Sequence, residues 1–255
     1  MPPLSTVTIP PNTPHTHTVV FLHGRGDTAT NFQYAFTQWQ DAQFRSLPDL
    51  FPFVKWVFPQ SEIRPLARFP GARISQWFDT WDLANLSYKE ELQIEGLKES
   101  VLSVKEILEK EVEELPGKDW GRLVIAGLSQ GGATVVHVLI SLEEKKLGGL
   151  MVFSGRMPFS GRSLDETREV LGLVGGGDDQ NVKETPALVQ HCIDDPMSRV
   201  ENGRAVRDSL EGFGTKVEWR EYDIGGHWFH SPDGIVDAAE WLSRFVFRDG
   251  QHRYD

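Results

Sequence analysis

The fold of this chain is decided by the stretch Leu123-Val124-Ile125-Ala126-Gly127-Leu128-Ser129-Gln130-Gly131-Gly132. Four apolar residues open it and the apolar run from 133 to 140 follows it, so we expect a buried strand, a tight turn and a helix. Gly-x-Ser-x-Gly at such a junction is typical of a nucleophile elbow. A serine lifted onto a sharp turn has a strained backbone, and the crowded positions two before and two after it favour glycine. An ordinary glycine–serine turn is the alternative interpretation.

Composition limits the class of protein. The 255 residues, 39% of them hydrophobic, suit one α/β domain with a sizeable core. A net charge of −11 argues against nucleic-acid binding, which needs clustered Lys and Arg. The single cysteine, Cys192, fits a reducing compartment, so we expect a cytoplasmic protein. We find no signal-peptide, lipidation or transmembrane pattern, so no stable membrane insertion is expected.

Stretches that indicate strands alternate with stretches of helical spacing. Strands are expected at residues 5–9, 18–22, 53–58, 123–126, 149–154, 187–192 and 216–222, and helices at 30–44, 89–115, 133–140, 164–171, 202–213 and 232–246. This alternation predicts an α/β fold with a mainly parallel central sheet and helices on both faces. We expect a single domain over residues 1–255, with an N-terminal edge strand and loop at 1–17 and a frayed tail at 248–255.

Two connections are long. Residues 59–87 are rich in proline, arginine and aromatic residues, and a loop of this length is usually functional. We expect Trp77, Phe78 and Trp81 to line a substrate pocket, although they would equally suit sealing the sheet edge. Residues 155–186 are irregular and polar, with a flexible loop expected at 175–179.

Candidate catalytic side chains follow three of the predicted strands. Ligands of parallel α/β sheets bind at the carboxyl ends of the strands, where Ser129, the pair Asp194 and Asp195, and His227 are expected. The order Ser, Asp, His is that of α/β-hydrolases. Histidine takes the proton of the serine, and a carboxylate orients the imidazole. We favour His227 over His230 because His227 directly follows the strand-end glycines; the residues themselves leave the choice of aspartate open.

The segment His23-Gly24-Arg25-Gly26 follows an early strand, where α/β-hydrolases place a second oxyanion donor. We expect the backbone N–H groups of Arg25 and Gln130 to bind an oxyanion. A glycine-rich turn that caps the next helix is an alternative, and both interpretations can hold together. His15 and His17 lack a third ligand nearby, so they do not predict a metal site.

These segments together resemble the acyl-protein thioesterase/carboxylesterase family of small α/β-hydrolases, also called the phospholipase/carboxylesterase family. The matching segments are residues 21–27, 77–79, 127–132, 191–196 and 226–227. The resemblance implies hydrolysis of thioesters or carboxylic esters, often with long acyl chains, and no cofactor. The family's H-G-x-x-D pattern, placed on His191 to Asp195, selects Asp195 as the acid. Gly24 and Trp228 complete the expected substrate-binding residues.

Three positions depart from the family pattern. Arg25 stands where the family commonly has leucine, Cys192 where it has glycine, and Arg156 where an aromatic residue commonly follows Ser-Gly. We therefore expect a serine esterase or thioesterase acting on a small or lipidated acyl ester or thioester. The alternatives are a short-chain carboxylesterase with a pocket closed by Arg25, and a non-catalytic ligand-binding homologue. The sequence does not give the oligomeric state.

Overall fold

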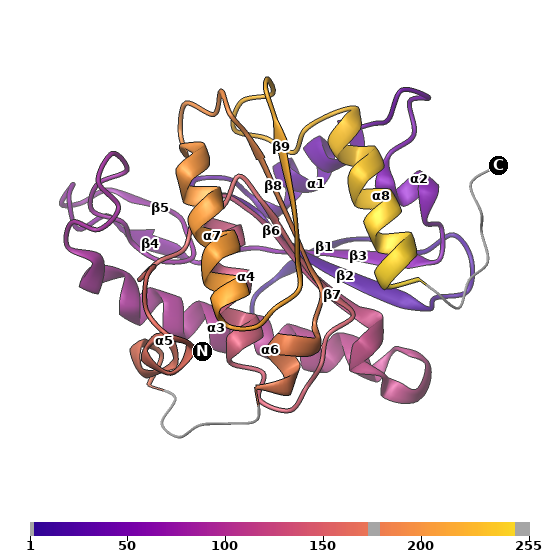
Figure 1. Cartoon of the computed structure of the whole chain (residues 1–255), viewed down its shortest axis with the longest axis horizontal. Helices are drawn as coiled ribbons and strands as arrows, with labels where there is room; N and C mark the ends of the chain where they lie inside the picture. Colours follow the sequence, from indigo (N-terminus) through magenta and orange to yellow (C-terminus); the bar gives the residue numbers. More distant parts are fainter. Residues whose placement is uncertain (1–2, 173–178, 248–255) are drawn as a thin grey trace.

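A seven-stranded sheet forms the centre of the computed structural model, which describes residues 3–172 and 179–247 (Figure 1). The strand order is β1-β3-β2-β6-β7-β8-β9, and only the edge strand β1 runs antiparallel to its neighbour. The strands are β1 (Thr6–Ile9), β2 (His17–Leu22), β3 (Val54–Pro59), β6 (Leu123–Leu128), β7 (Gly149–Phe153), β8 (Ala187–Cys192) and β9 (Val217–Tyr222). The expected tail at 248–255 and positions 175–178 of the expected loop lie outside the described residues.

Helices cover both faces of this sheet, as predicted, because its central strands are apolar on both sides. The longer helices are α1 (Ala29–Gln38), α3 (Gln93–Glu113), α4 (Gln130–Ile140), α7 (Val200–Gly212) and α8 (Asp233–Phe245). In β2, Val20 and Leu22 pack into the core formed with α3, α4 and α7, whereas Val19 and Phe21 pack into the core formed with α1 and α8. Alternate residues of one strand therefore belong to different cores.

Several elements differ from the sequence-based expectation. The helix expected to reach residue 44 ends at Gln38, because Trp39 adopts an extended backbone and packs its ring on Phe32 and Phe229. The connection 59–87 contains a small hairpin of β4 (Ile63–Pro65) and β5 (Arg73–Ser75), too short and exposed to show an alternating pattern. Short helices also form at α2 (Leu47–Leu50), α5 (Leu164–Val170), α6 (Gln180–Glu184), η1 (Glu90–Leu92), η2 (Pro116–Lys118) and η3 (Trp120–Arg122).

The turn between β6 and α4 has the strained geometry that the sequence predicts. Ser129 adopts φ 56° and ψ −117°, a backbone conformation unfavourable for any residue with a Cβ. A Cβ at Gly127 would lie 2.3 Å from the carbonyl carbon of Gly131, and a Cβ at Gly131 would lie 2.4 Å from the carbonyl oxygen of Leu22. Only glycine fits at either position, so this is not an ordinary turn.

We predict that the strain at Ser129 is measurable in the free energy of unfolding. Glycine is normally about 0.5–1 kcal/mol worse than alanine, but a left-handed backbone at a residue with a side chain costs on the order of 1–3 kcal/mol. Urea unfolding should therefore find Ser129→Gly at least as stable as Ser129→Ala. The matched pair at Ser103, inside α3, should show the ordinary penalty for glycine. An equal penalty at both positions would contradict a strained turn.

Candidate active site

One cavity gathers most of the predicted site residues at the carboxyl ends of the strands. It has a volume of about 350 Å³, and its lining includes Gly24, Arg25, Ser129, Gln130, His227 and Trp228. Ser129 directly follows β6, and His227 lies on the loop between β9 and α8. The sheet thus brings together residues that are far apart in the sequence.

His227 is paired with the carboxylate that follows β8. His227 Nδ1 lies 2.7 Å from Asp195 Oδ2, and Asp195 is 5% exposed. The other oxygen, Oδ1, accepts hydrogen bonds from the backbone N–H groups of Met197 and Ser198, both at 2.8 Å. A carboxylate accepts, so the proton of neutral His227 is on Nδ1 and Nε2 is the basic nitrogen.

A second histidine also contacts Asp195. His191 Nε2 lies 3.3 Å from Asp195 Oδ2 and 2.7 Å from the carbonyl oxygen of Ser198. Burial raises the pKa of Asp195, but hydrogen bonds from His191, His227 and the Ser198 N–H outweigh it and hold that pKa well below its usual range. Asp195 is therefore ionised at neutral pH and available to stabilise an imidazolium on His227. The sequence indicates His191 only as the first position of the H-G-x-x-D pattern and gives its side chain no role at the site.

The neighbouring Asp194 has a different task. Its Oδ1 accepts the backbone N–H of Gly226 at 2.8 Å, one residue before His227. Of the two adjacent carboxylates, Asp195 contacts the imidazole and Asp194 holds the backbone of the loop that carries it. This arrangement favours Asp195 as the orienting acid.

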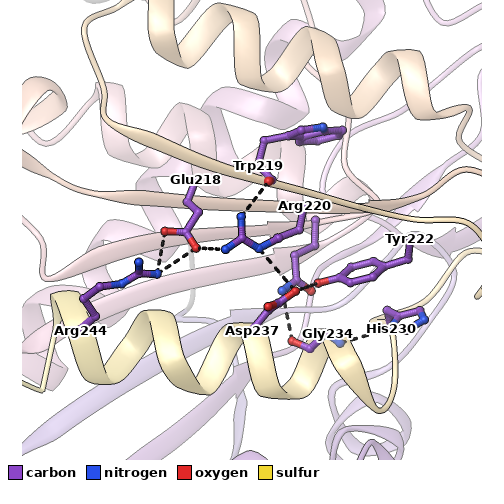
Figure 2. Close-up of polar contacts among 9 residues, drawn as sticks. Glu218, Trp219, Arg220, Tyr222, His230, Gly234, Asp237 and Arg244 are labelled. Carbon is purple, nitrogen blue, oxygen red and sulfur yellow. Dashed lines mark hydrogen bonds and ion pairs between the residues drawn. The ribbon is translucent and has the colours of Figure 1, made fainter.

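Polar contacts between β9 and α8 hold together the two elements that flank the His227 loop (Figure 2). Tyr222 at the end of β9 donates a hydrogen bond to Asp237 on α8 at 2.7 Å, and Glu218 pairs with Arg244 at 2.8 Å. His230 stacks on Tyr222 with ring centroids 4.1 Å apart, and its Nδ1 accepts a backbone N–H from the first turn of α8. His230 thus takes part in the contacts between β9 and α8, which supports His227 as the candidate base.

Two backbone N–H groups next to Ser129 have no partner. Neither the N–H of Arg25 nor that of Gln130 donates a hydrogen bond within residues 3–172 and 179–247. Gln130 is the first residue of α4, where helices leave N–H groups unpaired. A Cβ built on Gly24 would lie 4.0 Å from Ser129 Oγ, so the segment carrying Arg25 passes beside the serine. This geometry suits the expected oxyanion site.

Trp77 and Phe78 do not line the cavity, contrary to the sequence-based expectation. Both side chains are fully buried, and Trp77 Nε1 donates to the carbonyl oxygen of His23 at 2.8 Å. The Gln130 side chain joins the same layer, because its amide accepts from the Trp77 N–H and donates to the Phe78 carbonyl. The two aromatic residues are therefore buried behind the cavity lining, in contact with Gln130.

Trp81 is also absent from the lining. Its ring instead packs against Lys89, whose Nζ lies 3.3 Å from the ring centroid. The 59–87 connection contributes Thr80, Leu83 and Leu86 to the cavity. Single leucines in an irregular loop have no periodic pattern, so the sequence did not single them out.

The described residues contain no hydrogen bond between the Ser129 hydroxyl and His227. Both groups line the same cavity, with the His227 ring oriented by Asp195. Catalytic contacts are often long without substrate and tighten when it binds. A contact between the serine hydroxyl and Nε2 that forms when substrate binds is compatible with this arrangement.

The described residues form neither a metal-binding cluster nor a membrane-spanning helix. Within residues 3–172 and 179–247, no group of three or more His, Cys, Asp or Glu side chains is placed to hold a metal ion. His15, one of the two N-terminal histidines, forms a hydrogen bond with Thr18 Oγ1 at 2.9 Å. None of the helices in these ranges is long and apolar enough to cross a membrane.

Comparison with known proteins gives the family. The model of the phospholipase/carboxylesterase family matches residues 4–244. The chain belongs to this family. It is 29% identical over 248 residues to acyl-protein thioesterase 1 of Yarrowia lipolytica. This alignment covers 96% of this chain and 99% of that protein. It is 30% identical over 227 residues to carboxylesterase SOBER1 of Arabidopsis thaliana, with 89% of each chain covered.

A solved structure confirms the α/β-hydrolase fold. The crystal structure of Zea mays acyl-protein thioesterase 2 matches with a TM-score of 0.74 and 25% identity, over 95% of this chain and 99% of that chain. The family resemblance inferred from the sequence motifs is therefore confirmed, and with it the expectation of a hydrolase.

Proposed function

We propose that this protein is a serine hydrolase that cleaves carboxylic esters or acyl thioesters through an acyl-enzyme on Ser129. One observation carries the assignment of roles. Asp195 holds His227 by Nδ1 at 2.7 Å, in the cavity into which the strained turn places Ser129. This leaves the basic Nε2 of His227 for the serine proton.

The reaction follows from these positions. Ser129 Oγ attacks the carbonyl carbon while its proton passes to His227 Nε2, and Asp195 stabilises the resulting imidazolium. The oxyanion accepts hydrogen bonds from the N–H groups of Arg25 and Gln130, each worth roughly 3 kcal/mol. The C–O or C–S bond then breaks, and His227 gives its proton to the leaving group. Water, activated by His227, releases the acid from Ser129.

Two substrate ranges are compatible with the family. Leu83, Leu86 and Leu128 give the cavity an apolar wall, which suits an acyl chain and acyl-protein thioesterase-like activity. Arg25 and Arg156 line the same cavity, which favours the alternative of a carboxylesterase for short esters. A cytoplasmic location remains the prediction made from composition.

We predict that the protein hydrolyses p-nitrophenyl esters. Ser129→Ala should lower kcat by a factor of roughly 10⁶. A series from acetate to palmitate, with an acyl thioester alongside, measures the preferred chain length. A maximum at long chains with thioester turnover supports the thioesterase-like function, and a maximum at acetate or butyrate supports the short-chain carboxylesterase. A wild-type rate no higher than that of Ser129→Ala would contradict both.

The adjacent aspartates offer a matched pair of variants. Asp195→Asn should lower kcat by roughly 10⁴, because an amide at this position favours the wrong tautomer of His227. Asp194→Asn should cost far less, since Asp194 contacts only the backbone of the loop. Steady-state kinetics on one ester compares them. If Asp194→Asn is the more damaging change, the assignment of the acid is wrong.

A further inference from the structure

Two arginine residues line the cavity that contains Ser129. Arg156 follows β7 and is 9% exposed, and Arg25 follows β2 and is half-buried. Asp27 is the acidic residue among the lining, and its Oδ1 accepts the backbone N–H of Thr28. The chain as a whole carries a net charge of −11, so its composition does not explain a cationic cavity.

The partners of Arg156 within the structure are neutral. Its Nη2 donates to Thr80 Oγ1 at 3.1 Å and to Gln93 Oε1 at 2.8 Å, and its guanidinium lies over the ring of Phe78. In residues 3–172 and 179–247, no carboxylate lies within ion-pair distance of Arg156. Glu90 attracts it from farther away, and that carboxylate accepts the Phe159 N–H.

Two donors of Arg156 remain without a partner in the described part of the chain. Nε and Nη1 form no hydrogen bond there, and neither is among its fully enclosed atoms that lack a partner. Arg156 is one of the residues that line the cavity, so these N–H groups are the donors that it has left for a ligand. Burial lowers the pKa of Arg156 to about 10, so the group keeps its charge at neutral pH.

Arg25, on the segment that follows β2, is the second cationic residue of the lining. Its Nε donates to Gln76 Oε1 at 3.0 Å, another neutral partner. The positive charge of Arg25 also repels that of Arg156, so the two cations lie near each other. Asp79 attracts Arg25, but in the described part of the chain no carboxylate lies within ion-pair distance of either guanidinium. Burying two such cations is costly, and an anionic ligand would offset that cost.

We propose that Arg156, assisted by Arg25, binds a carboxylate carried by the ester or thioester substrate. The inference rests on the proposed function and narrows its substrate class to esters with an anionic group on either the acyl half or the leaving group. The open N–H groups of Arg156, on Nε and Nη1, can each donate a charge-assisted hydrogen bond to a carboxylate oxygen. The volume of about 350 Å³ is at the lower end for ligand pockets, which suits a short charged substrate better than a long acyl chain.

Pairs of esters that differ only in one charge test this subsite. On the acyl side, p-nitrophenyl hydrogen adipate is compared with its neutral methyl ester; on the leaving-group side, 4-acetoxybenzoate is compared with its methyl ester. The wild type should favour the anionic member of at least one pair by about 10- to 100-fold in kcat/KM, the effect of one charge-assisted contact. Raising the ionic strength should reduce this ratio.

Variants of Arg156 test whether this residue causes the preference in kcat/KM for the anionic ester. Arg156→Met should bring the ratio close to one, and Arg156→Lys should keep part of it, because lysine retains the charge without the planar set of guanidinium donors. Arg162→Met is the matched control, since Arg162 is exposed on the same connection and lies outside the cavity lining. That variant should keep the wild-type ratio.

The possible failures are distinguishable. Wild-type enzyme that hydrolyses the neutral esters but prefers neither anionic ester would overturn the carboxylate subsite and leave the proposed function intact. A preference that survives in Arg156→Met would assign the subsite to other residues. No hydrolysis of any ester would overturn the proposed function and this inference with it.

Discussion

The close approach of two backbone segments at Gly131 is the constraint on which the site depends. A Cβ there would lie 2.4 Å from the carbonyl oxygen of Leu22 and 2.7 Å from that of His23. This contact presses the start of α4 against the end of β2, so the segment with Arg25 runs beside Ser129. The Ser129 N–H donates to the carbonyl of Phe153 at 2.9 Å, which ties the same turn to β7. Packing of the backbone thus places the proposed nucleophile and the proposed oxyanion donors.

Much of this arrangement could be predicted from the sequence, because its causes are local. Runs of apolar residues marked the strands of the main sheet, and the end of each parallel strand marked where a functional side chain would lie. The steric need for glycine on both sides of Ser129 gave the sharp turn. The pairing of His227 with Asp195 required one further step, the family pattern, because adjacent aspartates look alike in sequence.

What the sequence did not provide depends on contacts between distant segments. Trp77 and Phe78 were expected on the surface of a pocket, but the amide of Gln130 bonds both of their backbones and seals them beneath it. The close approach of His191 to Asp195 depends on the turn after β8. Arg156 was recognised only as a departure from the family pattern; its neutral partners and open donors became visible in the folded cavity.

The role of Ser129 as nucleophile is tested most directly by covalent labelling with a fluorophosphonate, followed by peptide mapping. A serine activated by an adjacent base attacks phosphorus and keeps the phosphonyl group, whereas ordinary serines do not react. We expect one label per chain, on Ser129, with a much slower reaction in His227→Ala. No label on the wild type, or a label on a different serine, would contradict the assignment.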